Sequence, residues 1–133
     1  MIQVVAAILQ RDGDILVGQR TPGQSHALKW EFPGGKVEPG ESPEQALARE
    51  LQEELDIREA SGEIITRYQF AYPGKDAIEL IFFRVRTFDG EPRNLIFHDL
   101  RWHPRYLLAE LDFIEGDREF IQGIYTSAYG NHD

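Results

Sequence analysis

The sequence predicts an α/β (α+β) fold in which a mixed β-sheet is sandwiched between α-helices. Two observations support this prediction: strand-like apolar segments open the chain and recur after its middle, and helical segments lie between them and at the end. The 133 residues suffice for one domain, and no Pro/Gly/Ser-rich linker or repeat divides them. We therefore expect a single domain over residues 1–133.

The first elements are predicted from apolar runs and turn residues. Residues 2–9 are mostly apolar and indicate a buried strand. The turn residues Asp12-Gly13-Asp14 precede a second apolar segment at residues 15–18, which is predicted to be the returning strand. Residues 21–28 indicate a loop. Residues 30–40 hold three Gly and two Pro, which favours a strand end followed by a tight loop.

The clearest helix is predicted to begin after Ser42. Ser42 is a good N-cap, Pro43 suits the first helical position, and Gln45 can complete a capping box. Leucines at every fourth position then give one apolar stripe, formed by Leu47, Leu51 and Leu55. Beyond this helix we expect strands at 64–70, 78–85 and 100–102, a turn at Asp89-Gly90, and helical segments at 104–111 and 117–125.

Composition excludes several classes of partner. The chain carries 14 Lys+Arg against 23 Asp+Glu, a formal net charge of −9. It therefore lacks the basic excess expected of a protein that binds a nucleic-acid polymer or an anionic membrane surface. There is no Cys, which excludes thiolate nucleophiles and Cys-based metal sites. No apolar run is long enough to span a bilayer. We expect a cytoplasmic protein.

The predicted central helix carries a cluster of carboxylates. Glu50, Glu53 and Glu54 stand at i, i+3 and i+4, so they project side by side next to the leucine stripe. Like charges at these spacings repel unless something neutralises them, and oxygen-only ligands favour Mg²⁺, Mn²⁺ or Ca²⁺. A solvated helix face, with Arg49 as a surface partner of Glu53, is the alternative. Gly34-Gly35 just before the helix favours a combined site for metal and phosphate.

These residues resemble a known signature, the Nudix box. The match runs through Gly35, Glu41, Arg49-Glu50-Leu51, Glu53-Glu54 and Ile57, at the family's spacing. Asp56 stands where the family has a second Gly. That Gly would end the helix in a left-handed conformation, which Asp tolerates better than most residues. The chain is thus similar to the MutT-like and CTP-pyrophosphohydrolase-like branch of the Nudix hydrolases.

The resemblance implies a role for each box residue. Glu50, Glu53, Glu54 and the Gly35 carbonyl would bind Mg²⁺, for which Mn²⁺ can substitute. Glu41 would be a peripheral carboxylate, and Arg49 would orient a catalytic Glu. The catalytic set would be Glu53, Glu50 and Arg49. Related hydrolases often bring a further Glu from the segment that corresponds to 94–102, which has none here. His98 or Asp99 could substitute; otherwise Glu53 is the favoured residue to activate water.

The resemblance also implies substrate-binding residues. Arg20 and Lys36 lie where family members meet the nucleotide or its phosphates; both could instead be exposed charges. Asp117 lines up with a residue that reads the base, and it could equally cap the last helix. Tyr68, Phe70 and Tyr72 could stack on the base or form a sheet face.

The implied activity is Mg²⁺-dependent hydrolysis of a nucleoside triphosphate, including an oxidised one resembling 8-oxo-dGTP, to the monophosphate and pyrophosphate. The alternatives are another nucleoside diphosphate derivative as substrate, or a catalytically silent nucleotide-binding domain. The expected partner is the small-molecule nucleotide, bound by a monomer or a homodimer.

Overall fold

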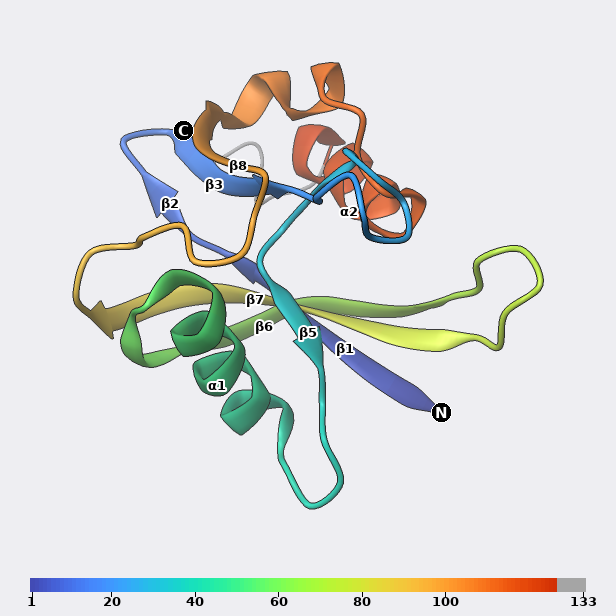
Figure 1. The fold of residues 1–133 in the computed structure, drawn as a ribbon, viewed down its shortest axis with the longest axis horizontal. Helices are drawn as coiled ribbons and strands as arrows, with labels where there is room; N and C mark the ends of the chain where they lie inside the picture. Colours follow the sequence, from blue (N-terminus) through green and yellow to red (C-terminus); the bar gives the residue numbers. More distant parts are fainter. Residues whose placement is uncertain (127–133) are drawn as a thin grey trace.

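A four-stranded mixed sheet forms the centre of this computed structural model, which describes residues 1–126 (Figure 1). Across the sheet the strands run β5 (Gly34–Lys36), β1 (Ile2–Ile8), β7 (Ile78–Asp89) and β6 (Arg58–Phe70). β1 and β7 are parallel and lie in the middle, whereas β5 and β6 pair antiparallel at the two edges. The central parallel pair is covered on both faces, which explains its continuous apolar runs.

A second, smaller sheet joins the first half of the chain to the second. It contains β2 (Gln10–Arg11), β3 (Asp14–Gln19), β4 (Trp30–Glu31) and β8 (Asp99–Pro104). β3 pairs antiparallel with each of the other three strands. Because β3 pairs with both β4 and β8, the sheet fixes the two ends of the loop 21–28 next to the start of β8.

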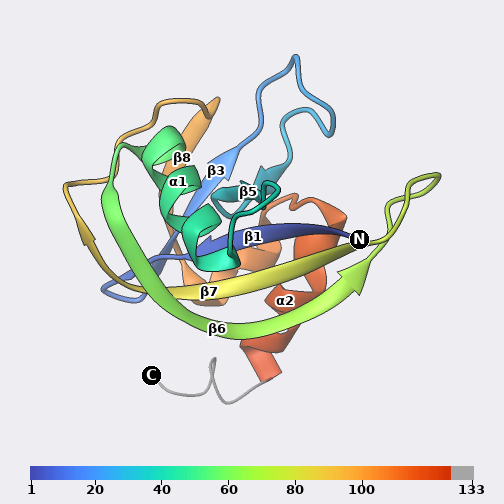
Figure 2. The ribbon, with the colours of Figure 1, turned by 90° about the horizontal axis from the view of Figure 1, so that it is seen from below.

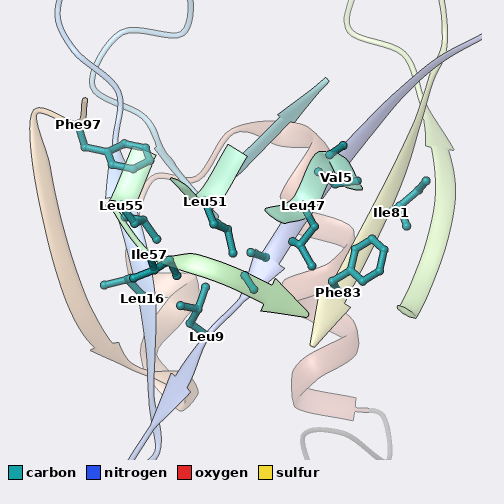
Figure 3. Packing of buried hydrophobic residues seen from close by; sticks show 13 residues of the cluster. Val5, Leu9, Leu16, Leu47, Leu51, Leu55, Ile57, Ile81, Phe83 and Phe97 are labelled. Carbon is teal, nitrogen blue, oxygen red and sulfur yellow. The ribbon is translucent and has the colours of Figure 1, made fainter. Parts of the chain in front are cut away.

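Two helices cover opposite sides of the central sheet (Figures 1 and 2). α1 (Pro43–Leu55) packs its leucines into one cluster with Val5, Ile81 and Phe83, as Figure 3 shows. α2 (Glu115–Thr126) contributes Phe120 and Ile121 to the cluster on the other side. The two cores give the predicted arrangement of helix, sheet and helix. No helix within residues 1–126 is long and apolar enough to cross a membrane.

The ends of α1 form as the sequence predicts. The Ser42 side chain accepts a hydrogen bond from the Gln45 N–H, the Gln45 side chain accepts one from the Ser42 N–H, and Pro43 opens the helix. Asp56 closes it in the left-handed conformation, with φ 57° and ψ 32°. The family glycine is therefore replaced by a residue that adopts the same backbone geometry.

Several predicted boundaries in the second half of the chain were wrong. β6 begins at Arg58 and not at residue 64, and β7 runs on to Asp89, past residue 85. Register shifts near residues 58–66 break the alternation of apolar and polar side chains, so the pattern underestimated β6. β8 covers 99–104, and the segment predicted helical at 104–111 forms a 3₁₀ helix, η1 (Arg105–Glu110).

The last helix also starts earlier than predicted. α2 begins at Glu115, so Asp117 lies inside its first turn. The Asp117 N–H donates to the Ile114 carbonyl oxygen, and only 3% of the residue is exposed. Asp117 is therefore not the N-cap of this helix, and that alternative was wrong.

Candidate active site

The glycine pair before α1 lies directly against two glutamates. The Gly34 N–H donates to Glu54 Oε1 at 3.0 Å. A Cβ on Gly35 would stand 2.5 Å from the Glu50 carboxyl group, and a Cβ on Gly34 would stand 1.9 Å from the Val5 carbonyl oxygen. Gly34 thus requires glycine, because a side chain would collide with backbone, and a side chain at Gly35 would displace the Glu50 carboxyl group. The glycine loop therefore lies against the carboxylate helix, and their common role in binding metal and phosphate stays a prediction.

Arg49 holds three glutamates together. Its guanidinium donates to Glu41 Oε2 at 2.8 Å, to Glu50 Oε1 at 3.0 Å and to Glu53 Oε1 at 2.9 Å. It also donates to the Lys36 carbonyl oxygen at 2.9 Å. This bonding holds the pKa of Glu41 at about 2 and raises the pKa of Arg49 itself. Arg49 is thus the centre of a network, more than a surface partner of Glu53.

Glu50 and Glu54 are the two recessed carboxyl groups of the helix. Burial raises the pKa of Glu54 to about 9, although the Gly34 N–H acts in the opposite direction. Burial also raises the pKa of Glu50, opposed by the hydrogen bond from Arg49. Two carboxyl groups that share a recess resist ionising together unless a positive charge joins them. The electrostatics of this pair therefore suit a bound cation.

The donor atoms fit a hard divalent cation. Carboxylates of Glu50 and Glu54 lie beside the Gly34-Gly35 backbone, and oxygen ligands are those that Mg²⁺ prefers. Glu53 lies apart from them: its side chain is 53% exposed and paired with Arg49. Within residues 1–126, no three acidic, His or Cys side chains converge as a preformed metal cluster. The structure thus brings two of the three predicted carboxylate ligands together and leaves Glu53 at the rim.

A groove of about 1140 Å³ runs past this site. Its walls include Lys36 and Glu41 of the glycine loop, together with His26 and the segment from Tyr72 to Ile78 between β6 and β7. Lys36 is exposed there, in a position to meet an anionic ligand. Sequence reasoning missed His26 and Lys75 as groove residues, since neither belongs to a motif. His26 packs on Tyr72 with ring centroids 4.8 Å apart.

Arg20 is engaged by the protein itself. It donates to Glu31 Oε1 at 2.9 Å and to the Ser25 carbonyl oxygen at 2.7 Å, and 19% of its side chain is exposed. Burial raises the pKa of Glu31, and Arg20 counteracts it. The predicted nucleotide contact of Arg20 stays a prediction, while its structural contact is to the loop 21–28.

Asp117 belongs to α2, which covers the side of the central sheet opposite α1 (Figures 1 and 2). Its Oδ2 accepts a hydrogen bond from the Phe32 N–H at 3.3 Å, so α2 is linked to the segment between β4 and the glycine pair. Burial raises the pKa of Asp117 to about 8, against the effect of that hydrogen bond. A buried carboxylic acid can both donate and accept a hydrogen bond. This property suits the reading of a nucleobase edge.

The aromatic residues of β6 have structural contacts. The Tyr68 hydroxyl donates to the Gly116 carbonyl oxygen at 2.6 Å, and its ring stacks on Phe82. The Tyr72 hydroxyl accepts the Gly116 N–H at 3.0 Å. Phe70 packs edge to face against Tyr72. In the structure Tyr68 and Phe70 pack against other protein side chains, as the sheet-face alternative expects. Their stacking on a base stays a prediction.

The segment before β8 does not offer an obvious base. His98 is exposed and its N–H donates to the Gln19 carbonyl oxygen at 2.8 Å. Asp99 pairs with Arg101 at 3.1 Å on the surface of β8. Neither side chain has a contact with the box glutamates among the interactions of residues 1–126. Glu53 thus keeps the role that the sequence favours, again as a prediction.

Comparisons with known proteins agree with this geometry. The NUDIX domain family matches residues 1–124. The chain is 48% identical over 130 residues to the 8-oxo-dGTP diphosphatase of Haemophilus influenzae, which covers 97% of this chain and 95% of the relative. It is 50% identical over 90 residues to the CTP pyrophosphohydrolase of Escherichia coli, or 68% of this chain and 66% of the relative.

The fold is shared with a solved relative. The MutT NUDIX hydrolase from Burkholderia pseudomallei superposes with a TM-score of 0.80 at 26% identity, over 90% of this chain and 95% of that one. The predicted fold class is thereby confirmed. Since the family match spans the glycine loop, the box helix and the segment around Asp117, the chain belongs to the NUDIX domain family, as a hydrolase of that family.

Proposed function

We propose that this chain hydrolyses an oxidised nucleoside triphosphate of the 8-oxo-dGTP kind to the monophosphate and pyrophosphate, with Mg²⁺ as cofactor. Glu50, Glu54 and the Gly35 carbonyl would hold the cation, which neutralises the phosphate charge and lowers the pKa of a bound water. The observation that carries the proposal is the recessed pair Glu50 and Glu54 against the glycine loop, tied by Arg49 to Glu53.

The protein's own groups supply the remaining chemistry. Glu53 is exposed at the rim, and its two oxygens face the Arg49 guanidinium at 2.9 and 3.4 Å. A carboxylate at the rim of the site can accept a proton from an attacking water. We therefore assign Glu53 the role of general base. Lys36, exposed in the groove, would bind the phosphate chain.

The substrate class rests on the relatives and on Asp117. The Haemophilus relative is named for 8-oxo-dGTP and the Escherichia relative for CTP. A neutral Asp117 presents a donor and an acceptor, and a base edge offers the complementary pair. CTP is therefore the second candidate, and the panel of substrates must include it.

A product analysis tests the proposal. Wild-type protein with Mg²⁺ is incubated in ¹⁸O-labelled water with 8-oxo-dGTP, dGTP, CTP, dATP and a nucleoside-diphosphate sugar, and the products are separated by ion exchange and mass spectrometry. We expect monophosphate and pyrophosphate in equal amounts, with 8-oxo-dGTP giving the highest kcat/KM. Hydrolysis only of the nucleoside-diphosphate sugar would assign another substrate class. No hydrolysis of any nucleotide would mean a silent binding domain.

A further inference from the structure

The last turn of α1 receives its hydrogen-bond donors from a distant loop. The final carbonyl groups of a helix have no partner within the helix. Here the Arg93 N–H donates to the Leu55 carbonyl oxygen at 2.8 Å, and the Leu95 N–H donates to the Glu54 carbonyl oxygen at 3.1 Å. The segment between β7 and β8 therefore caps the helix at the residue that carries a site carboxylate.

Asn94 holds this loop in the capping shape. Its side chain donates to the Phe97 carbonyl oxygen at 2.9 Å and accepts the Phe97 N–H at 2.8 Å. The single side chain thus closes residues 94–97 into a turn. The N–H groups of the two residues next to Asn94, Arg93 and Leu95, are the ones that reach α1, so the position of the Leu95 N–H depends on this closure.

Phe97 anchors the loop to the second sheet. Phe97 is 7% exposed, and its ring lies over Gly18 of β3, where a Cβ would stand 2.4 Å from the ring. Figure 3 shows the ring directed into the cluster that contains Leu55. The next residue donates its N–H to the Gln19 carbonyl oxygen. The loop is therefore fixed at one end to β3 and at the other to α1.

We propose that Asn94 is a positioning residue for Glu54. It fixes the Leu95 N–H on the Glu54 backbone, and the Glu54 side chain reaches the Gly34 N–H from that backbone. The contacts form one chain from Phe97 through Asn94 and Leu95 to Glu54 and the glycine loop. The segment 94–97 thus helps to position Glu54, although it supplies no glutamate of its own. Its link to cation binding rests on the proposed function; its link to Glu54 does not.

A backbone NMR experiment on the cation-free protein tests the geometric step. The Gly34 amide reports the position of the Glu54 carboxyl group, and the Leu95 amide reports the cap. In Asn94→Ala we expect the Leu95 amide to lose protection from hydrogen exchange and the Gly34 amide to change in shift and exchange rate. Ile96→Ala is the matched control, since Ile96 is 44% exposed in the same loop, and it should leave both amides unchanged.

Cation binding and kinetics test the functional step. For Asn94→Ala we expect the dissociation constant for Mn²⁺ alone to rise about 10-fold, the usual scale for removing a group that orients a metal ligand. kcat for the nucleotide should fall on that scale while KM changes little. Gly18→Ala, which displaces the Phe97 ring, should reproduce the same changes from the opposite side of the loop.

The outcomes separate this inference from the proposed function. A Leu95 amide that is freed while the Gly34 amide and Mn²⁺ affinity stay at wild-type values overturns the positioning role. So does a Leu95 amide that stays protected in Asn94→Ala. A wild-type protein that hydrolyses no nucleotide refutes the proposed function alone, because the Gly34 and Leu95 amides still report the geometry.

Discussion

The two helices that flank the central sheet contribute to the site in opposite ways. α1 brings several acidic side chains from one and a half turns, and Arg49 joins them through contacts between near neighbours in sequence. α2 brings one carboxyl group, Asp117, whose partner Phe32 is 85 positions away. Glu53 at the α1 end is half exposed, whereas Asp117 is almost fully buried.

From this difference we infer that α1 serves the chemistry and that Asp117 of α2 serves substrate recognition. The exposed carboxylate of Glu53 can leave Arg49 for water without disturbing the core, because its side chain is 53% exposed. A ligand that fails to pair with the buried Asp117 carboxyl group would bind more weakly, since leaving a buried polar group without a hydrogen bond costs free energy. We therefore expect changes at α1 to affect turnover and changes at Asp117 to affect the choice of substrate.

Removing a charge from the box helix is expected to give the largest effect. Glu53→Gln and Glu54→Gln should each lower kcat by at least about 100-fold, the scale of losing a positioned catalytic group. Steady-state pyrophosphate release measures it. Glu44→Gln, exposed in the first turn of the same helix, is the control and should keep wild-type turnover. Near-normal kcat in Glu53→Gln would contradict its role as base.

Divalent cations are expected to stabilise the fold. A cation that binds only the folded chain adds about 2.7 kcal/mol to the free energy of unfolding at 100 times its dissociation constant. Thermal or urea unfolding with Mg²⁺, compared with NaCl at equal ionic strength, measures this difference. Glu54→Gln should reduce the stabilisation. A wild-type melting curve that ignores millimolar Mg²⁺ and Mn²⁺ would argue against a cation site.

Asp117→Asn is expected to change the ranking of substrates. Asn keeps an oxygen for the Phe32 N–H but replaces the acidic O–H with an amide, so a base matched to Asp117 is mispaired. The ratio of kcat/KM values for 8-oxo-dGTP, dGTP and CTP should shift by about 5- to 150-fold, from roughly 1–3 kcal/mol for a buried mispaired group. Asp112→Asn, on the surface, is the control. Unchanged ratios would leave base selection to other residues.

Asp117 should also make stability depend on pH. Its pKa rises from an ordinary 3.8 to about 8 on folding, so the folded chain binds the proton more tightly. This stabilisation is complete below about pH 4 and is lost as pH rises through 8, with a slope no steeper than about 1.4 kcal/mol per pH unit. Urea unfolding from pH 4 to 9 should show a shallower decline in Asp117→Asn than in wild type. The same decline with pH in both proteins would contradict a raised pKa of Asp117.

The sequence predicts the α1 end of the site better than the α2 end. The capping box at Ser42, the left-handed Asp56 and the carboxylate spacing depend on neighbours within a few residues, so local patterns were enough. The recess of Glu54 against Gly34, and the capping of α1 by residues 93–95, arise from chain segments brought together only in the fold. The N-cap alternative for Asp117 was wrong because α2 begins two residues earlier, and its contact with the Phe32 N–H joins segments 85 positions apart that no local pattern reveals.

The smallest effect is expected at Asp56, where the α1 helix ends. Glycine at this left-handed position relieves backbone strain of about 1 kcal/mol, but it gives the unfolded chain more freedom, which costs about 0.5–1 kcal/mol. Asp56→Gly also removes the ion pair with Arg93 at 3.2 Å. Both partners are exposed, which makes such a pair worth about 0–1 kcal/mol.

These contributions nearly cancel, so the free energy of unfolding of Asp56→Gly should stay within about 1 kcal/mol of wild type, which urea unfolding can resolve. Its kcat should be unchanged, because Leu95 still caps the Glu54 carbonyl. Arg93→Ala removes the ion pair alone and retains the backbone bond from residue 93 to Leu55, so the difference between the two variants isolates the backbone term. A loss of turnover in Asp56→Gly with Arg93→Ala unaffected would show that the helix terminus, and not only its carboxylates, controls the site.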